Sequence, residues 1–388
     1  MSIHLNLFLT TTISACLTLS NTANATSYTA IDLNYPSDTS SRGVAINDSG
    51  HVVGSVFSDQ YVANRGFLYG ADDQFGANGE GTKILGHLDG SAYGYYNSSF
   101  YGVSSFARGI NASGRVVGES YFNNIVPVSH AYITDTNGRM MTDLGTLGGF
   151  NSAAYGINAS GQVVGYAFLA GNQAAHAFIT SANGVSMTDL GTLGGSFSAA
   201  VGINAGGQVV GYSSIAGDSI LHSFITGSNG MGLTDLGNLD ASAINDSGQV
   251  VGTSNGHAFI TDAYGMDLTD LGTLGGSSSI ANGINARGQV VGSSYTSGNV
   301  QHAFVTGDNG EDMIDLSLLV TLDGGDYIYN ATGVNDLGQI VANSIFGRAY
   351  LLTESEISAV PLPNSWALLL SGFGMIGIMA RRRKGQTG

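Results

Sequence analysis

Residues 154–166 read AYGINASGQVVGY, and variants of this stretch recur along most of the chain. At its centre, an asparagine follows an apolar residue and precedes a glycine by three positions. This Asn-x-x-Gly tetrad begins at Asn47, Asn111, Asn158, Asn204, Asn245, Asn285 and Asn335, with spacings of 64, 47, 46, 41, 40 and 50 residues. Repeats of this length indicate an architecture in which each copy is one supersecondary unit packed against its neighbours.

Each copy contains four short runs with high β-propensity. In the third copy they lie around residues 154–158, 162–166, 176–180 and 187–191. The tetrad between the first two runs predicts a type I turn that ends with glycine in the left-handed conformation. Asn-Gly or Tyr-Gly between the third and fourth runs predicts a second hairpin. The second run is apolar at consecutive positions, Val163 and Val164, which is typical of a strand covered on both faces.

Four antiparallel strands per copy, covered on both faces, predict an all-β protein built as a seven-bladed β-propeller over residues 26–355. The seventh copy has its third run at residues 348–352 and lacks a fourth, whereas a matching run at residues 29–33 precedes the first copy. We expect this N-terminal run to complete the last blade and close the ring. A β-solenoid or two smaller β domains are the alternatives.

Composition agrees with a turn-rich β protein. The 388 residues include 59 glycines, 18 tyrosines and 16 phenylalanines, and only 10% of them are charged. This balance excludes a disordered chain. The net charge is −16, and four of the 12 basic residues stand together at residues 381–384. Because phosphate binding needs clustered Lys and Arg on the folded part, we expect no nucleic-acid partner.

The N-terminal segment predicts a secretory signal peptide over residues 1–25. Residues 5–19 are mostly apolar, and Ala23 and Ala25 form a small-x-small cleavage pattern. A buried first helix is one alternative. Another is a lipobox-like reading of residues 13–16, in which Cys16 would carry lipid. Cys16 is the only cysteine, so cleavage after Ala25 would leave a chain without disulfides or thiol catalysis.

The C-terminal segment, residues 356–388, predicts a short transmembrane helix at 366–380 followed by a basic tail at 381–384. Fifteen residues of helix span about 22 Å, which is less than the roughly 30 Å of a hydrocarbon core. The flanking tryptophan and the basic tail indicate that the tail stays cytoplasmic. The residues that mark this segment are Pro361, Pro363, Trp366, Arg381, Arg382 and Arg383.

This order of parts resembles the PEP-CTERM sorting signal of Gram-negative bacteria, in which an exosortase recognises a Pro-Glu-Pro motif, a short transmembrane helix and an Arg-rich tail. Leu362 stands here where the family has Glu. The resemblance implies an exosortase-type processing enzyme as partner. It also implies a transient stage in the inner membrane, followed by release or attachment at the cell surface.

The repeat itself resembles the extracellular HAF repeat over roughly residues 40–355. His-Ala-Phe stands at 176–178, 257–259 and 302–304, with the variants His-Ala-Tyr at 130–132 and His-Ser-Phe at 222–224. Asp-Leu-Gly-Thr-Leu-Gly-Gly and Gly-Ile-Asn-x-x-Gly-Gln-Val-Val-Gly accompany it. The resemblance implies an exported repeat protein.

The repeated histidine does not predict a metal ring, because Arg65 and Arg348 occupy its position in the first and seventh copies. We expect instead a structural His/Arg–Asp pair inside each copy. The expected pairs are His130–Asp143, His176–Asp189, His222–Asp235, His257–Asp270, His302–Asp315 and Arg348–Asp32. Ile84 replaces the aspartate in the first copy. If such a pair is buried, loss of one partner costs about 3–5 kcal/mol.

Possible ligand contacts lie in the insertion of the first copy, where Tyr93, Tyr95, Tyr96 and Tyr101 stand among small polar residues. Such tyrosines form contact surfaces for sugars or proteins, and a packed covering loop is the alternative. The acidic turns at 72–73 and 323–326 are candidates for Ca²⁺, although such turns are usually just solvated. We expect no other cofactor or metal.

No catalytic constellation is visible, because the repeat aspartates would spread round a ring instead of converging. We therefore expect an exported, non-enzymatic cell-surface or matrix-associated protein that serves as a binding or structural scaffold. Its partner would be an extracellular polysaccharide or a surface protein. The alternative is a propeller enzyme of the glycoside hydrolase or lyase type, which carboxylates clustered at the central channel would favour.

Overall fold

The computed structural model describes residues 27–34, 40–58, 63–70, 81–88, 104–122, 128–136, 138–218, 220–263 and 265–355. Tyr28–Ser355 is one compact unit. Its described residues form β-strands, turns and five short 3-10 helices, and no α-helix, which confirms the all-β prediction. No helix within these ranges is long and apolar enough to cross a membrane. The helix predicted at 366–380 lies outside the described residues.

The 28 strands fall into seven groups of four, numbered here along the chain. Group 1 is β2 (Ser40–Ile46), β3 (Val52–Ser58), β4 (Ala63–Tyr69) and β5 (Thr82–Ile84); group 2 is β6 (Ser105–Ile110), β7 (Val116–Phe122), β8 (Val128–Thr134) and β9 (Met141–Gly145). Group 3 is β10 (Gly148–Ile157), β11 (Val163–Leu169), β12 (Ala175–Thr180) and β13 (Met187–Gly191); group 4 is β14 (Gly194–Ile203), β15 (Val209–Ile215), β16 (Leu221–Thr226) and β17 (Leu233–Gly237).

The remaining groups follow the same plan. Group 5 is β18 (Asp240–Ile244), β19 (Val250–Ser254), β20 (His257–Thr261) and β21 (Leu268–Gly272); group 6 is β22 (Gly275–Ile284), β23 (Val290–Thr296), β24 (Gln301–Val305) and β25 (Ile314–Asp315). Group 7 is β26 (Ile328–Val334), β27 (Ile340–Ser344), β28 (Ala349–Ser355) and β1 (Ser27–Asp32). The 3-10 helices are η1 (Ala182–Gly184), η2 (Ser228–Gly230), η3 (Asp308–Gly310), η4 (Leu316–Leu318) and η5 (Asp323–Gly325).

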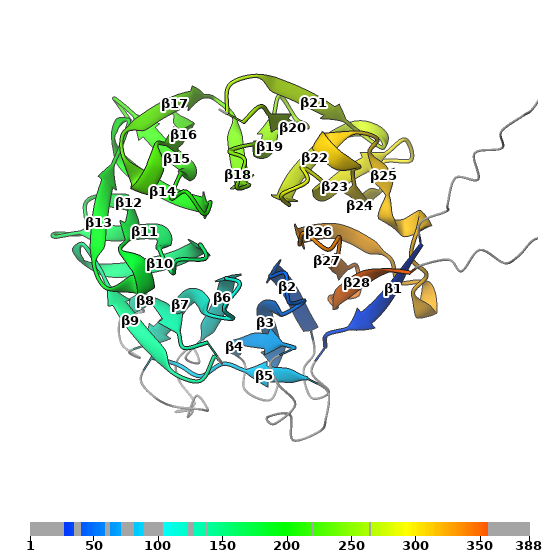
Figure 1. Cartoon of the computed structure of the whole chain (residues 1–388), viewed down its shortest axis with the longest axis horizontal. Helices are drawn as coiled ribbons and strands as arrows, with labels where there is room; N and C mark the ends of the chain where they lie inside the picture. The colour runs from blue at the N-terminus through cyan, green and yellow to red at the C-terminus, as the bar shows by residue number, and fades with distance from the viewer. Residues whose placement is uncertain are drawn as a thin grey trace, which may run out of the picture. The chain divides into compact units, whose positions relative to one another are not determined.

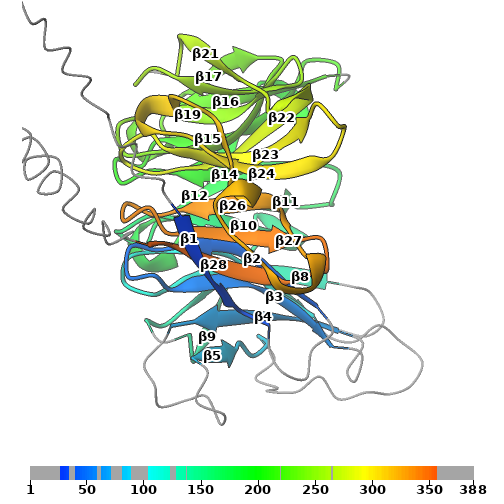
Figure 2. The ribbon, with the colours of Figure 1, turned by 90° about the vertical axis from the view of Figure 1, so that its right-hand side faces the viewer.

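The groups stand around a central opening, with the first strand of each group nearest to it (Figures 1 and 2). Consecutive strands within a group pair antiparallel, and a single parallel pair, Ala175 with Phe197, joins groups 3 and 4 into one eight-stranded sheet. In group 7 the outer strand is β1, from the start of the described chain. Leu33 N donates to Ala349 O at 2.9 Å, and the Thr29 hydroxyl donates to Thr353 O at 3.2 Å.

The turn predicted for Asn-x-x-Gly is confirmed in all seven copies. The glycine N–H donates to the carbonyl of the tetrad's asparagine at 2.9–3.0 Å. The seven glycines have φ between 74° and 84°, which is the left-handed region that glycine adopts without a steric penalty. The tetrad therefore folds from local chemistry alone.

The hydrophobic core lies between adjacent groups. Val163 packs against group 2 in a cluster that includes Ile133, whereas Val164 packs against group 4 beside Phe224. Consecutive valines thus cover both faces of β11, as the apolar run predicts. The glycine that follows, Gly165, lies so close to the carbonyl of Ala153 on β10 that a Cβ would collide with it. Each group therefore needs a neighbour on both faces to bury its apolar side chains.

Candidate binding site

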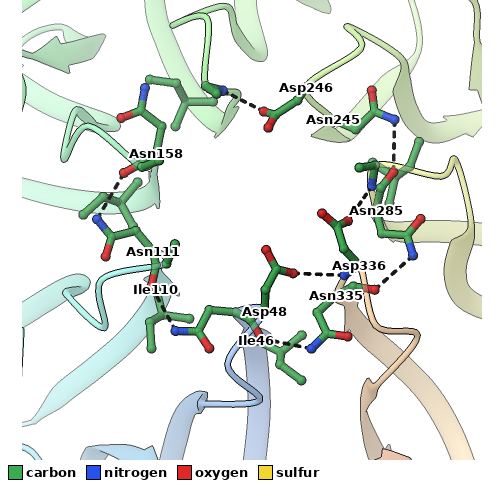
Figure 3. Close-up of a pocket in the computed structure, with 18 of the residues that line it drawn as sticks. Ile46, Asp48, Ile110, Asn111, Asn158, Asn245, Asp246, Asn285, Asn335 and Asp336 are labelled. Atoms are coloured by element: carbon green, nitrogen blue, oxygen red, sulfur yellow. Dashed lines mark hydrogen bonds between the residues drawn. The ribbon is translucent and has the colours of Figure 1, made fainter. Parts of the chain in front are cut away.

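The seven repeat asparagines form a hydrogen-bonded ring around the central opening, part of which Figure 3 shows. Each amide Nδ2 donates to the backbone carbonyl of the asparagine in the next group at 3.0–3.1 Å, and the series returns from Asn335 to Asn47. Each Oδ1 accepts the backbone N–H four residues later, inside its own turn. With residue exposures of only 3–6%, these asparagines hold the turns and join the groups.

The glutamine of the repeat supports this asparagine ring. In groups 3 to 7, Nδ2 of the asparagine also donates to the side-chain carbonyl of the glutamine four residues later, at 2.8–2.9 Å. His51 and Arg115 occupy this position in groups 1 and 2. Both amide hydrogens and the amide oxygen of the asparagine are therefore used in five of the seven groups, so little of this side chain is left to bind a ligand.

A cavity of about 220 Å³ lies beside the asparagine ring, lined also by the apolar residue before each asparagine. Three carboxylates, Asp48, Asp246 and Asp336, point into the opening (Figure 3). Asp246 Oδ1 accepts Ala205 N at 2.8 Å, Asp336 Oδ1 accepts Ala286 N at 2.8 Å, and Asp48 Oδ1 accepts Asp336 N at 3.0 Å. Each aspartate thus caps a turn of the preceding group.

Every inner strand carries a β-bulge three residues before its asparagine. The residue skipped in the pairing register, called here the bulge residue, is Val44, Arg108, Tyr155, Val201, Ser242, Asn282 or Thr332. A bulge takes its residue out of the ladder and re-aims the side chain. Three of these side chains reach the next group: Asn282 Nδ2 donates to Ala331 O at 2.8 Å, Thr332 Oγ1 to Gly43 O at 3.1 Å, and Arg108 stacks on Tyr155.

Aromatic side chains form a continuous series on the inner two strands of groups 2 to 4. We call this series the aromatic arc; it comprises Phe106, Tyr121, Tyr155, Tyr166, Phe197 and Tyr212. The ring centroids of Tyr155 and Tyr166 are 5.9 Å apart, those of Tyr166 and Phe197 6.5 Å, and those of Phe197 and Tyr212 5.9 Å. Those of Phe106 and Tyr121 are 6.2 Å apart. The series crosses from group 2 to group 3 through Arg108, which is 5.3 Å from the Phe106 centroid and 5.8 Å from that of Tyr155. It crosses from group 3 to group 4 through Tyr166 and Phe197.

An ion pair lies within the aromatic arc. The Arg108 guanidinium donates to Glu119 Oε1 at 2.7 Å, and Glu119 is buried. Burial acts to lower the pKa of Arg108, but the hydrogen bond and the charge of Glu119 outweigh it and the pKa lies above the ordinary value. Burial, with smaller contributions from Tyr166 and Glu119, raises the pKa of Tyr155. The phenol therefore stays protonated at neutral pH, and the pair adds no net charge.

Corresponding positions in the other groups carry small side chains. Where groups 3 and 4 have Tyr166 and Tyr212 on their second strands, group 2 has Glu119, and groups 1, 5, 6 and 7 have Ser55, Thr253, Ser293 and Asn343. The bulge residues of groups 5 to 7 are also small and polar. The inner two strands therefore carry aromatic side chains in groups 2 to 4 and small, mostly polar ones at these positions in the other groups. Neither feature was predicted from the sequence, although the variable position three residues before each asparagine is a usable signal.

All six predicted His/Arg–Asp pairs are in contact, between the third and fourth strands of their groups. Nδ1–Oδ2 distances are 2.7–2.9 Å for the five histidines, and Arg348 Nη1 is 3.1 Å from Asp32 Oδ2. In group 1, Ile84 stands opposite Phe67, as Asp189 stands opposite Phe178 in group 3. The histidine side chains are 18–39% exposed, so the cost given for a buried pair does not apply.

The aspartates of these pairs also bind the backbone. Asp143, Asp235 and Asp270 each accept the N–H of the glycine two residues later at 2.7 Å. For Asp143 and Asp235, partial burial raises the pKa, but the histidine and the backbone N–H lower it below the ordinary value. For Asp270 the backbone N–H is the largest influence, and the pKa is again lowered.

The other predicted site residues divide between described and undescribed parts of the chain. In the turn at 323–326, Asp326 Oδ1 accepts the backbone N–H of Tyr327 and Phe346. Within the described ranges no group of three His, Cys, Asp or Glu side chains is placed to hold a metal. Outside these ranges lie Cys16, the cleavage residues Ala23 and Ala25, the 72–73 turn, the C-terminal segment, and Tyr93, Tyr95, Tyr96 and Tyr101.

Solved β-propellers share this fold. The β-propeller domain of the trilobed protease from Pyrococcus furiosus, described as having an open velcro topology, aligns over 84% of this chain and 100% of that chain, with 10% identity and a TM-score of 0.53. A catalytically inactive virginiamycin B lyase from Staphylococcus aureus, complexed with quinupristin, aligns over 84% and 99%, with 11% identity and a TM-score of 0.50. A prolyl endopeptidase aligns over 83% of this chain and half of its own, with 13% identity and a TM-score of 0.53. These likenesses define the fold class alone.

The C-terminal segment defines the route of the protein. Residues 359–384 match the PEP-CTERM protein-sorting motif, which confirms the sorting signal predicted from the sequence. The motif implies export through the membrane to the cell surface and an exosortase-type processing partner. No curated protein matches the chain.

Proposed function

We propose that this protein is an exported, non-enzymatic scaffold at the cell surface or in the surrounding matrix, which binds an extracellular polysaccharide or a surface protein through the wall of its central opening. The observation that carries the proposal is the contrast within each inner strand. The asparagine is the same in all seven groups, whereas the bulge residue three positions earlier is Val, Arg, Tyr, Ser, Asn or Thr. A constant frame that presents variable side chains is the arrangement of a recognition surface.

The proposal includes a seven-bladed propeller in which each four-stranded group is a blade. The pairing of β1 with β28 supports closure by the N-terminal strand, and the bond from Asn335 to the carbonyl of Asn47 supports contact between the last and first blades. An open solenoid would leave the first and last copies apart. We also assign the repeat to the HAF type, because its His and Phe positions recur in the third strands.

The proposed route begins with a signal peptide over residues 1–25 and continues with a transient stop in the inner membrane at 366–380. Processing near Pro363 then releases the propeller or attaches it at the surface. The sorting motif at 359–384 supports this order. Mass spectrometry of the protein in the surface and released fractions tests the route. We expect no peptide beyond about residue 363, and a peptide ending at Gly388 in those fractions would contradict processing.

An enzyme that hydrolyses or lyses extracellular polysaccharide is the second candidate. The three aspartates that point into the opening favour it, because the reaction needs carboxylates in a cleft. Each of them is committed to a backbone N–H in the preceding group, which favours a structural role. Incubation of the exported protein with extracellular polysaccharide, followed by a reducing-end assay and an assay for unsaturated sugars, tests the two candidates. Binding without chain cleavage supports the scaffold, and cleavage that is lost in Asp48→Asn or Asp336→Asn supports the enzyme.

A further inference from the structure

We infer that the aromatic arc, together with Arg108 and Glu119, is a binding site for a neutral pyranose oligosaccharide. The inference rests on the proposed binding function and names the ligand class. Four features of the described residues carry it: partial exposure of the rings, their mutual contacts, the absence of net charge in the Arg108–Glu119 pair, and the polar bulge residues of groups 5 to 7.

Partial exposure separates the arc from the structural aromatic residues of the fold. Phe178, Phe224 and Phe259, from the third strands, are at most 1% exposed. Tyr155, Tyr166 and Tyr212 are only partly buried. A ring that serves stability alone gains most from complete burial, so a contiguous series of partly exposed rings indicates a contact surface.

The rings of the arc are held in place before a ligand arrives. Tyr166 contacts rings on both sides, Tyr155 in its own group and Phe197 in the next, with tilted planes at 41° and 51°. A tyrosine has few rotatable bonds, so little conformational entropy is lost when it binds. A preorganised series of rings costs little entropy when a ligand with an apolar face stacks on it.

Charge favours a neutral ligand. Arg108 and Glu119 neutralise each other at 2.7 Å, and the chain carries a net charge of −16, which repels polyanions. Burial raises the pKa of Tyr166 and Tyr212, so their phenols remain neutral donors and acceptors. The arc therefore provides stacking faces and hydrogen-bonding groups without a cationic site for an acidic sugar.

Polar bulge residues in groups 5 to 7 add hydrogen-bonding groups. Ser242, Asn282 and Thr332 carry a hydroxyl or an amide there. Asn282 and Thr332 donate to backbone carbonyls of the next group, and their oxygens keep the capacity to accept. A pyranose has an apolar C–H face and a rim of hydroxyls, and small-molecule sites combine apolar surface with a few polar groups in this way. A peptide that binds by strand addition needs a regular strand edge, and the bulges interrupt the inner strands.

Calorimetric titration of the mature, exported protein tests the inference. The probes are cellohexaose and mannohexaose, with trigalacturonate as the acidic probe and a tryptic digest of serum albumin as the peptide probe. We expect saturable binding of a neutral hexasaccharide, weakened about tenfold by Tyr166→Ala. The matched control is Tyr295→Ala, which removes a tyrosine from the corresponding strand β23 outside the arc. It should leave the affinity within twofold.

Tyrosine iodination of the unaltered protein provides a readout that does not depend on a folded variant. A saturating neutral hexasaccharide should slow the modification of Tyr155, Tyr166 and Tyr212 at least threefold, and leave Tyr295 unchanged. Protection of Tyr295 alone, or binding of only trigalacturonate or only the peptides, would overturn the sugar site while the binding function stands. Cleavage of the bound hexasaccharide would retain the site and overturn the non-enzymatic function. Absence of all binding would overturn both.

Discussion

The asparagine ring and the bulge residues lie three positions apart on the same seven strands, yet they behave in opposite ways. The asparagines are identical in every group because both ends of the amide are bonded to buried backbone groups. The bulge residues differ because the bulge removes them from the ladder. Their contacts with the next group vary accordingly: Asn282 and Thr332 donate to its backbone carbonyls, whereas Arg108 stacks on Tyr155. The comparison shows how one repeated strand supplies a frame and a recognition surface at once. It predicts that changes to the frame are costly and that changes at the bulges are mild.

Deletion of residues 29–33 should have the largest effect, because it removes most of the strand that completes group 7. The change exposes the edge of β28 and removes Leu33 from the core, where it is fully buried. An exposed edge strand promotes aggregation, so we expect insoluble protein or a collapse of Tm in thermal unfolding. Ile31→Thr, at an exposed position of the same strand, is the control and should be tolerated. Unchanged solubility and Tm in the deletion variant would show that β1 does not close the ring.

Asn335→Ala should destabilise the protein by about 2–4 kcal/mol. The substitution leaves the N–H of Gln339 without its side-chain acceptor, at about 1–3 kcal/mol. It also removes one of the two hydrogen bonds to the carbonyl of Asn47, which keeps the bond from Gly50 N, at about 1 kcal/mol. Urea unfolding measures the loss. Asn285→Ala, inside the series, is the matched control and should cost the same within about 0.5 kcal/mol. A much smaller loss for Asn335→Ala would mean that the ring of asparagines is open between its last and first members.

His176→Ala should cost about 0.5–1 kcal/mol, because the side chain of its partner Asp189 is 39% exposed and surface pairs contribute little. His176→Arg should restore most of this loss, since group 7 already uses Arg348 in the same pair. Chemical unfolding of the two variants with and without a chelator provides the measurement. If the chelator lowers the stability of the parent protein, the histidines bind a metal and the structural interpretation is wrong.

The His–Asp pairs should also make the free energy of unfolding depend on pH. The pKa of Asp143, Asp235 and Asp270 is lowered in the folded protein, so the folded state binds these protons less readily than the unfolded chain. Their stabilising contribution is complete above the ordinary pKa of about 3.9 and decreases as the pH falls through the lower folded values. Replacement of all three by Asn should reduce the slope of the unfolding free energy against pH between about pH 4 and pH 2. If the triple variant and the parent protein have the same slope, the fold does not stabilise these aspartates as anions.

Local chemistry explains what the sequence predicted and what it missed. The Asn-x-x-Gly turn, the valines that cover both faces of β11, and the His–Asp pairs follow from residues on one strand or on adjacent strands. The caps from Asp48, Asp246 and Asp336 join residues of different copies, so no pattern within one copy reveals them. The aromatic arc depends on which groups are neighbours and on a bulge that turns Tyr155 and Arg108 out of the ladder. The alternation of side chains along a regular strand predicts neither the order of the groups nor the direction of a side chain at a bulge.

The most direct test of the account compares Asn204→Ala with Val201→Ser, two truncations three residues apart on β14. Asn204 bonds the N–H of Gln208 and the carbonyl of Asn245. Val201 is a bulge residue that is only partly buried against the core cluster of Val210 and Ile244, and its counterpart in group 5 is already serine. Urea unfolding of the two variants should show a loss of about 2–4 kcal/mol for Asn204→Ala and at most about 1 kcal/mol for Val201→Ser. Equal losses, or a larger loss at Val201, would contradict the division of the inner strands into a frame and a recognition surface.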